Sequence, residues 1–312
     1  TLIRDPDSDE SLPYNVGGAN VWTTMSVDSQ RDLVFIPTAS ASPNFYGGLR
    51  PGDNRYANSV LVLKAQTGEL VWHYQTIHHD IWDWDLPPHP LLVDVTTEDG
   101  KQPIVIALGK TGMVYTFHRD NGDPYFEIEE RAVPTDGILG DQLSPTQPFP
   151  VKPPPLVRQG ISPDDAWGVT PYEREACREM IASARYGGMF TPMSTKGTVM
   201  YPQVGGGANW GGGTFDPERN ILVVPVAQVP FYVKLIPEEE VDKDLAKTPM
   251  AGNPMGPPGL IKGTKYGLQQ KPLLSPLYTP CTEPPWSMLV AVDMVKGEIL
   301  WKKPFGKIDK LS

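Results

Sequence analysis

The chain has 312 residues, of which 39% are hydrophobic, so it is long enough to bury a sizeable core. Its 35 prolines and 30 glycines leave little room for long helices. The net charge of -10 at pH 7 argues against nucleic acid or an anionic membrane surface as a partner, but it is compatible with a small polar substrate. The longest apolar stretch, at 221–233, is interrupted by prolines and is too short to span a bilayer of about 30 Å.

Short strands joined by tight turns recur along the chain. A first unit lies at 26–37, and the clearest one joins a strand at 59–63, a polar turn at Gly68 and a strand at 70–74 that carries Trp72. An alternating run with a glycine turn predicts a β-hairpin, and a large aromatic side chain is suited to packing between sheets.

The same pattern returns at the far end, where a strand at 288–293 leads through Gly297 to a strand that ends in Trp301. Weaker copies lie at 114–126 and 214–225. Short antiparallel strands repeated in this way are typical of β-propeller blades, and about four to six blades would fit this length. We therefore predict an all-β propeller of four-stranded antiparallel blades, with Trp72 and Trp301 buried between neighbouring blades.

Two long segments interrupt the repeat. The first, at 137–169, is rich in proline, and its part at 137–159 is predicted to be an extended surface connection without regular structure. The second, at 236–285, starts with an acidic run and then alternates Gly, Pro and Lys. Loops of this size on a rigid scaffold are lids, docking surfaces or disordered.

A single helix is predicted at 171–184, after the first of these segments. Thr170 can cap its start, Pro171 suits the first helical position, and Glu173 completes a capping box. Gly187 is the expected stop.

The two cysteines, Cys177 and Cys281, would form one disulfide in an exported protein, or they are two buried thiols; their spacing does not separate these alternatives. The chain opens with TLIRD, which is typical of the middle of a loop. We therefore expect a piece of a longer precursor, in which the lack of a leader says nothing about the compartment.

Ionisable side chains gather at 78–85, with two tryptophans between them. In an extended strand, His78 and Asp80 would share one face and His79 would lie on the other, so a common centre would need a bend. A carboxylate enclosed by Trp and His side chains can be desolvated enough to act as a general base. The alternative is a loop of solvated acids with packing tryptophans. Adjacent histidines also make a poor catalytic zinc site. The residues of this cluster are His78, His79, Asp80, Trp82, Asp83, Trp84 and Asp85.

A set of short motifs, in this order, carries a resemblance to a known family. The motifs are GANVW at 18–22, SPNFYGG at 42–48, RPGDN at 50–54, HHDIWD at 78–83, KTG at 110–112 and FTP at 190–192. The set resembles the pyrroloquinoline-quinone (PQQ)-dependent dehydrogenases, above all the membrane-bound glucose and quinate dehydrogenase type and its soluble relatives. The resemblance implies an eight-bladed propeller locked by Trp-docking motifs, which needs roughly twice this length. Residues 1–312 are therefore expected to be a partial propeller domain.

The resemblance also implies an activity, the oxidation of a sugar, cyclic polyol or other alcohol by hydride transfer to PQQ. Asp80 matches the general base, and it would also contact a calcium ion held by the quinone. Lys110 matches the lysine on the quinone oxygens, and Trp22 matches the tryptophan beneath the planar cofactor. His79 is placed beside the cofactor by the same match. Without the resemblance, Lys110 would be an ordinary turn lysine and Trp22 a core residue.

The chain departs from the family pattern at several positions. Ser40 and Ser42, both candidate cofactor-binding residues, stand where many members have an Asn calcium ligand, although the glucose type also lacks it. Asn44 stands where relatives often have Asp, which puts activity in doubt. Pro225 lies near the place of a cofactor-contacting Asn and cannot donate a hydrogen bond. The upstream half and the region that closes the ring are missing, so this piece alone is expected to be inactive.

The resemblance further implies electron transfer to a membrane quinone or a cytochrome. It also implies a periplasmic location, with a tether to the inner membrane through a part that precedes this chain. Calcium is expected rather than a lanthanide, because lanthanide-using members carry an extra acid where this chain has Trp82. The alternative from another class is a non-catalytic propeller scaffold of the outer-membrane assembly type. The joint presence of Trp22, Asp80 and Lys110 favours the enzyme, since a scaffold has no reason to keep them together.

Overall fold

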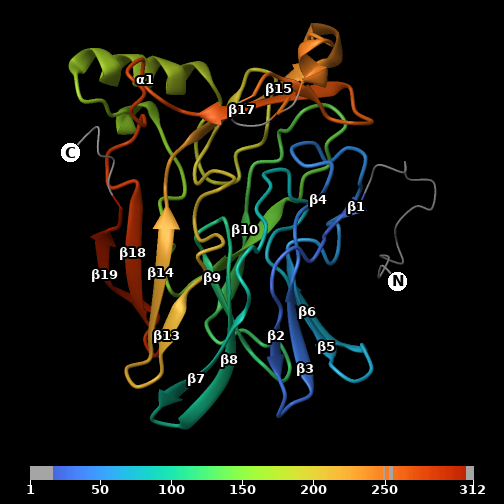
Figure 1. Ribbon diagram of the computed structural model, residues 1–312, viewed down its shortest axis with the longest axis vertical. Helices are drawn as coiled ribbons and strands as arrows, with labels where there is room; N and C mark the ends of the chain where they lie inside the picture. Colours follow the sequence, from blue (N-terminus) through green and yellow to red (C-terminus); the bar gives the residue numbers. More distant parts are fainter. Residues whose placement is uncertain (1–16, 249, 253–255, 307–312) are drawn as a thin grey trace.

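The computed structural model describes residues 17–248, 250–252 and 256–306. Its sheets are antiparallel throughout, and three of them fan out side by side in chain order (Figure 1). The one described α-helix, α1 (Pro171–Ser183), lies above the fan together with a fourth sheet. Among the described residues, no helix has the length and apolar character needed to cross a membrane.

The first sheet of the fan has the order β2 (Ser26–Asp28), β3 (Leu33–Pro37), β5 (Ser59–Lys64) and β6 (Leu70–Gln75). Gly68 has a φ of 72°, a region that glycine enters at no steric cost, so the predicted turn between β5 and β6 is confirmed. A short ladder of β1 (Gly17–Gly18) and β4 (Ala41–Ser42) lies beside this sheet.

The second sheet consists of β7 (Leu91–Thr97), β8 (Gly100–Leu108) and β9 (Val114–His118). Successive side chains of β8 point to opposite faces. Val105 and Ala107 join one hydrophobic core, whereas Ile104, Ile106 and Leu108 join another. The central sheet is thus covered on both faces, as expected for a propeller blade between neighbours.

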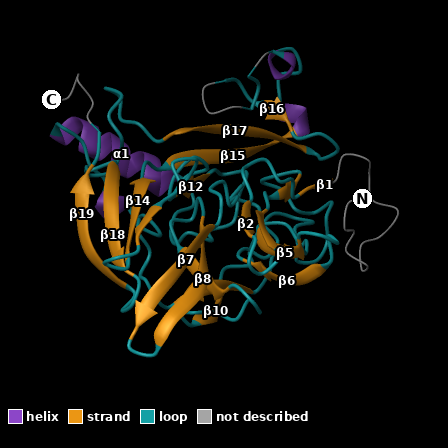
Figure 2. Cartoon of the chain, turned by 60° about the horizontal axis from the view of Figure 1, so that its bottom comes forward, coloured by secondary structure: helices purple, strands orange, loops and turns teal. Residues whose placement is uncertain are grey.

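The third sheet has the order β13 (Thr214–Asp216), β14 (Ile221–Ala227), β18 (Ser287–Asp293) and β19 (Glu298–Pro304). Between β14 and β18 the chain leaves this sheet and builds another. That sheet has the order β12 (Thr198–Met200), β15 (Phe231–Pro237), β17 (Tyr266–Pro272) and β16 (Gly259–Leu260). Figure 2 shows β15 and β17 passing over the ends of the fan sheets.

Both interrupting segments contain more regular structure than the sequence predicts. In the first, β11 (Thr146–Pro150) pairs with β10 (Ile128–Ala132), and a 3₁₀ turn, η1 (Pro163–Asp165), follows. The expectation of an irregular connection over 137–159 is therefore wrong, because β11 forms its ladder with a strand that precedes the segment. The second segment supplies β16 and β17, and it adds the turns η2 (Glu238–Glu240) and η3 (Leu245–Lys247).

Helix α1 follows the prediction closely at its start. Thr170 accepts a hydrogen bond from the Glu173 main-chain N–H, and both halves of the capping box are present. The helix ends earlier than expected, at Ser183 with Ala184 as its C-cap, so Gly187 is not its stop. Cys177 in α1 forms a disulfide with Cys281, which decides between the two alternatives left open by the sequence.

The two repeat tryptophans differ in burial. Trp72 is 8% exposed, packs against Phe35 and Phe117, and donates its indole N–H to the Arg119 carbonyl at 2.9 Å. Trp301 is 39% exposed. The predicted burial of Trp301 is wrong: β19 is an edge strand of its sheet, and most of its residues are exposed.

Candidate active site

Asp80 lies in the irregular segment between β6 and β7, and its side chain is enclosed by donors. It is 2% exposed. Its Oδ1 accepts from the Trp82 N–H at 2.7 Å. Its Oδ2 accepts from Ser40 Oγ at 2.5 Å, Asn58 Nδ2 at 2.7 Å and the Trp84 N–H at 2.8 Å. These partners all donate, which suits an ionised carboxylate and fixes its orientation.

The main chain around Asp80 is bent rather than extended. His79 and Asp83 have φ values of 45° and 62°, in the left-handed region that L residues rarely adopt. The main chain is therefore bent at the place where His78, His79 and Asp80 would need a bend to share one centre. The buried Arg50 guanidinium holds this bend by donating to the Asp80 main-chain carbonyl and, at 3.1 Å, to that of Pro43. Burial lowers the pKa of Arg50, and the Asp80 carboxylate opposes this shift.

Lys110 follows β8 and is only 4% exposed, between two carboxylates. Its Nζ donates to Asp85 Oδ2 and, at 2.9 Å, to Asp83 Oδ2. Burial lowers the pKa of Lys110, but the two carboxylates outweigh burial and raise it. Burial raises the pKa of Asp83 to about 7, against the opposing effect of Lys110. Asp85 Oδ1 accepts from the Ser40 N–H at 2.6 Å, so Ser40 joins this cluster to Asp80.

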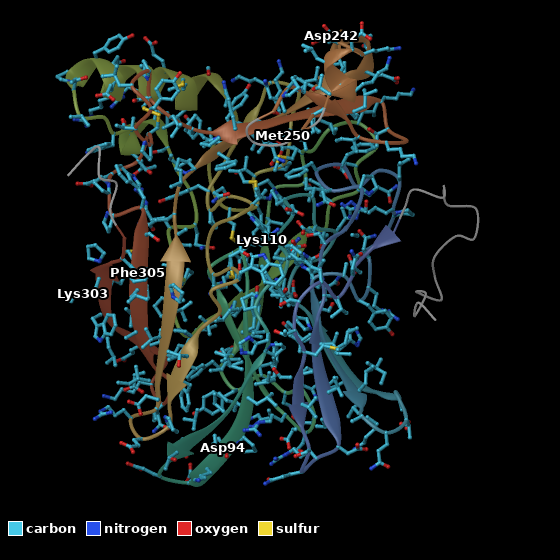
Figure 3. The ribbon with its side chains drawn as sticks, viewed as in Figure 1. Asp94, Lys110, Asp242, Met250, Lys303 and Phe305 are labelled. Atoms are coloured by element: carbon cyan, nitrogen blue, oxygen red, sulfur yellow. A yellow bond between two sulfur atoms is a disulfide. The ribbon has the colours of Figure 1, made fainter. Side chains whose placement is uncertain are left out.

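Two exposed indoles lie beside Lys110. Its Nζ is 5.6 Å from the ring centroid of Trp22, which is 43% exposed. The exposed Trp210 ring meets Trp22 edge-on at 4.8 Å. Gly207 comes so close that a Cβ there would lie 2.2 Å from the Lys110 carbonyl oxygen. Figure 3 shows Lys110 in the interior, between the fan sheets and the layer above them. Trp22 is thus not a core residue, because its side chain is partly exposed beside Lys110 and Trp210.

The two histidines of the cluster point elsewhere. His79 is 1% exposed, with Nδ1 2.7 Å from the Gly52 carbonyl and Nε2 3.2 Å from Asp141 Oδ1. Both ring nitrogens are thus used within the protein, which leaves none for a cofactor. The Nε2 of His78 is 3.0 Å from Glu130 Oε1. The two rings therefore do not converge on a metal.

Beside Asp83 lies a hollow of about 530 Å³, where Asn44 donates from Nδ2 to Asp83 Oδ1. Ser42, which pairs with Gly17 in the β1–β4 ladder, also lines this hollow. The lining residues are Ser42, Pro43, Asn44, Phe45, Ile261, Lys262 and Leu268. Asn44 thus joins the lining of the hollow to Asp83, which in turn accepts a hydrogen bond from Lys110.

The structure brings Trp22, Asp80, Lys110 and Ser40 together, although they are distant in sequence. It excludes the alternative of solvated acids, since Asp80 and Asp85 are buried. The tryptophans at 82 and 84 are packing residues, stacked at 5.2 Å. Sequence reasoning missed Trp210, Asn58 and Asp141. The glycine-rich run at 205–213 was a usable signal for Trp210, whereas the other two carry no local signal.

A calcium ion would need six to eight oxygen ligands. Near Asp80 the described residues offer the Ser40 hydroxyl and Asn58 Oδ1, a buried oxygen without a hydrogen-bond partner. Within the described ranges, no group of three or more His, Cys, Asp or Glu side chains could hold a metal. These residues do not make a calcium site by themselves, and Asp80 as a metal ligand stays a prediction.

Residues 4–312 match the family model described as "PQQ: Glucose/ethanol/alcohol dehydrogenase, beta-propeller domain". The chain belongs to this family of quinoprotein propellers. It is 37% identical to the quinoprotein glucose dehydrogenase of Escherichia coli K12, over 97% of this chain and 38% of that protein. It is 35% identical to the quinate/shikimate dehydrogenase (quinone) of Acinetobacter baylyi, over 98% of this chain and 39% of that protein.

Solved structures support the propeller fold. The quinohemoprotein alcohol dehydrogenase from Comamonas testosteroni matches with a TM-score of 0.57 at 19% identity, over 93% of this chain and 35% of that one. A europium-containing methanol dehydrogenase matches with a TM-score of 0.55 at 17% identity, over 92% of this chain and 40% of that one. The predictions of family and fold are confirmed. This quinoprotein propeller spans about two fifths of the length of the curated relatives it matches.

Proposed function

We propose that this chain carries the reaction centre of an oxidoreductase that oxidises a sugar, cyclic polyol or other alcohol with PQQ. The observation that carries the proposal is a continuous set of hydrogen bonds beside the exposed Trp22 ring. Ser40 and Asp85 link the Asp80 carboxylate to the Lys110 ammonium. When bound, PQQ supplies the acceptor for the hydride that leaves the substrate carbon. Trp22 offers an aromatic surface on which such a planar group can stack, whereas the Trp210 ring is inclined at 75° to it.

Asp80 acts in this proposal as the general base. It takes the proton of the substrate hydroxyl while the hydride leaves the adjacent carbon, so the hydroxyl oxygen becomes a carbonyl oxygen. Its hydrogen bonds hold the carboxylate in one orientation and require no rearrangement before the proton moves. General bases typically contribute a factor of about 10² to 10⁴ in rate.

Lys110 acts as the electrostatic partner. Asp83 and Asp85 keep its ammonium charged and hold it beside the Trp22 ring, with Nζ 5.6 Å from the ring centroid. A fixed positive donor in a buried site stabilises negative charge that develops on a bound ring during reduction. The hollow beside Asn44 and Asp83 is the proposed route toward this centre for a polar substrate.

The remaining proposals concern the setting of the enzyme. The disulfide between Cys177 and Cys281 supports an oxidising compartment, so we propose the periplasm. We propose a membrane quinone or a cytochrome as electron acceptor. Glucose and quinate are the first substrates to test, because they appear in the names of relatives at 35% to 37% identity.

Substitution of the two charged residues tests the mechanism in a protein of the relatives' full length that contains this chain, called here the longer protein. Asp80→Asn should bind PQQ normally but lower kcat by roughly 10²- to 10⁴-fold, since only the base is lost. Lys110→Ala should weaken both PQQ retention and kcat, because its charge interacts with the ring before and during reduction. Dye-linked assays with glucose, quinate and simple alcohols measure the rates. Matched controls are Asp99→Asn, in the exposed turn between β7 and β8, and Lys101→Ala, at the exposed start of β8. Full turnover in Asp80→Asn would refute the mechanism.

The identity of the metal is a separate proposal, namely calcium rather than a lanthanide. Trp82 stands where lanthanide-using members carry an extra acid, and its indole N–H is already engaged with the Thr191 carbonyl at 2.9 Å. Thermal unfolding of the protein with PQQ and either calcium or lanthanum should show stabilisation by calcium at lower concentration. A strict lanthanide requirement would contradict this proposal.

A further inference from the structure

We propose that Asp141 is a positioning residue for the reaction, which acts through His79 on the main chain that presents Asp80. The inference rests on the proposed role of Asp80 as the base. Asp141 lies in the proline-rich segment between β10 and β11, 62 positions from His79 in sequence. A segment that the sequence indicates to be a surface connection thus reaches the reaction centre.

The contact between the two side chains is buried and close. Nε2 of His79 is 3.2 Å from Asp141 Oδ1, and each side chain is 1% exposed. The same Asp141 oxygen accepts from the Gly47 N–H at 3.0 Å. A Cβ at Gly47 would lie 2.0 Å from His79 Nε2 and 2.7 Å from Asp141 Oδ1, so only glycine leaves room for this junction. Three separate loops therefore meet here at atomic contact.

His79 is held in an unfavourable backbone conformation by this junction. Its φ is 45°, and residues held in such regions persist only where their surroundings over-determine them. Its main-chain N–H donates to the Asp53 carbonyl at 3.0 Å, and its Nδ1 lies 2.7 Å from the Gly52 carbonyl. Asp141 closes the remaining side of the ring. Since Asp80 follows directly, a change in the His79 backbone would move the Asp80 carboxylate.

The charge of Asp141 is not explained by local stability. Its Oδ2 is buried and has no hydrogen-bond partner within the described part of the chain. A buried polar atom without a partner is unfavourable, because it has lost its hydrogen bonds to water. Nδ1 of His79 faces the Gly52 carbonyl oxygen, and the Asp141 carboxylate places a second oxygen beside Nε2. An apolar residue at 141 would avoid this unpaired atom but would remove the oxygen beside His79 Nε2.

Asp141→Asn tests the proposal in the longer protein loaded with PQQ. We expect kcat to fall by about 10- to 100-fold, because a misplacement of about 1 Å can cost 10²-fold in rate. KM and the affinity for PQQ should change by less than about twofold, since Asp141 touches neither ligand in the proposed arrangement. With substrate deuterated at the oxidised carbon, the isotope effect on kcat should increase. Asp136→Asn is the matched control, because Asp136 lies in the same segment with its side chain 76% exposed.

A double-mutant cycle tests the route through His79. His79→Gln should reproduce the loss in kcat, and the double variant should lose little more than either single one, because both changes break the same contact. Hydrogen exchange of the peptide spanning 79–84, measured without PQQ, should be faster in each variant and unchanged in Asp136→Asn. If Asp141→Asn does not fold, the kcat of His79→Gln tests the proposal by itself.

The outcomes separate this inference from the proposed function. An unchanged kcat in folded Asp141→Asn, together with a lost kcat in Asp80→Asn, would overturn the inference and leave the proposed function intact. A parallel loss of kcat and PQQ affinity would also overturn it, since that result indicates general damage to the site. Full activity in Asp80→Asn would overturn both.

Discussion

Asp83 and Asp85 share the single ammonium of Lys110, so the ionisation of Asp83 changes the net charge of the site. Burial raises the pKa of Asp83 to about 7, compared with about 3.9 for an unperturbed Asp. The folded protein therefore binds a proton at this position between these pH values, whereas the unfolded protein does not. By linkage, this group makes the folded state less stable as pH rises from about 4 through about 7.

Asp83→Asn should remove this pH dependence. Relative to the unmodified protein, the free energy of unfolding of the variant should rise between pH 5 and pH 8, because the variant no longer carries a carboxylate that must ionise while buried. Urea unfolding at both pH values measures the difference. Asp99→Asn, in the exposed turn between β7 and β8, should show no such trend. A difference that is constant with pH would contradict the raised pKa of Asp83.

At the scale of elements, helix α1 is attached to the sheets by a small core of its own and by the disulfide. The cluster includes Cys177 and Ile181 of the helix and Val199 of β12. Replacement of both cysteines by alanine should lower the free energy of unfolding by about 2–4 kcal/mol. Denaturant unfolding measures this loss, and proteolysis within 171–183 should become faster. Reduction of the unmodified protein should give the same result; unchanged stability in both would contradict it.

Local signals explain which elements the sequence predicts. The start of α1 follows from Thr170, Pro171 and Glu173, all within one helical turn. Strand β11 was missed because its sequence, TQPFP, contains two prolines, which argue against a strand unless it lies at an edge. It does lie at an edge, paired only with β10. Strand β17 is largely polar and depends on pairing with β15, which no local pattern reveals.

The residues of the site also differ in whether the sequence alone identifies them. Trp22, Asp80 and Lys110 belong to short motifs that carry a family resemblance, so they could be named from the sequence. Asn58 and Asp141 come from irregular segments, and only the fold brings them to Asp80 and His79. The motif predicts that His79 contacts the cofactor, because it adjoins Asp80. Its left-handed backbone conformation instead turns the ring toward Gly52 and Asp141. Backbone conformations of this kind are set by tertiary contacts rather than by residue type.

At the scale of the whole molecule, the three fan sheets are not equivalent. The two faces of the sheet of β7, β8 and β9 pack into two different hydrophobic cores. The sheet that ends in β19 exposes Leu300 and Trp301 to 49% and 39%, and Phe305, directly after β19, is 53% exposed. A propeller blade normally presents such a surface to a neighbour. Since the relatives are more than twice as long as this chain, a further sheet of the longer protein is the expected cover for β19.

The two repeat tryptophans provide the test of this view. In the 312-residue chain, Trp72→Ala should cost about 3–5 kcal/mol of unfolding free energy, because it opens a cavity against Phe35 and Phe117. Trp301→Ala should cost less than about 1 kcal/mol in the same chain, since its ring is already partly in water. In the longer protein, the cost of Trp301→Ala should rise toward that of Trp72→Ala, as a covered indole loses packing when it is removed. Denaturant unfolding of both variants in both proteins gives the four values. Equal costs for Trp301→Ala in the short and long proteins would show that no further sheet covers β19.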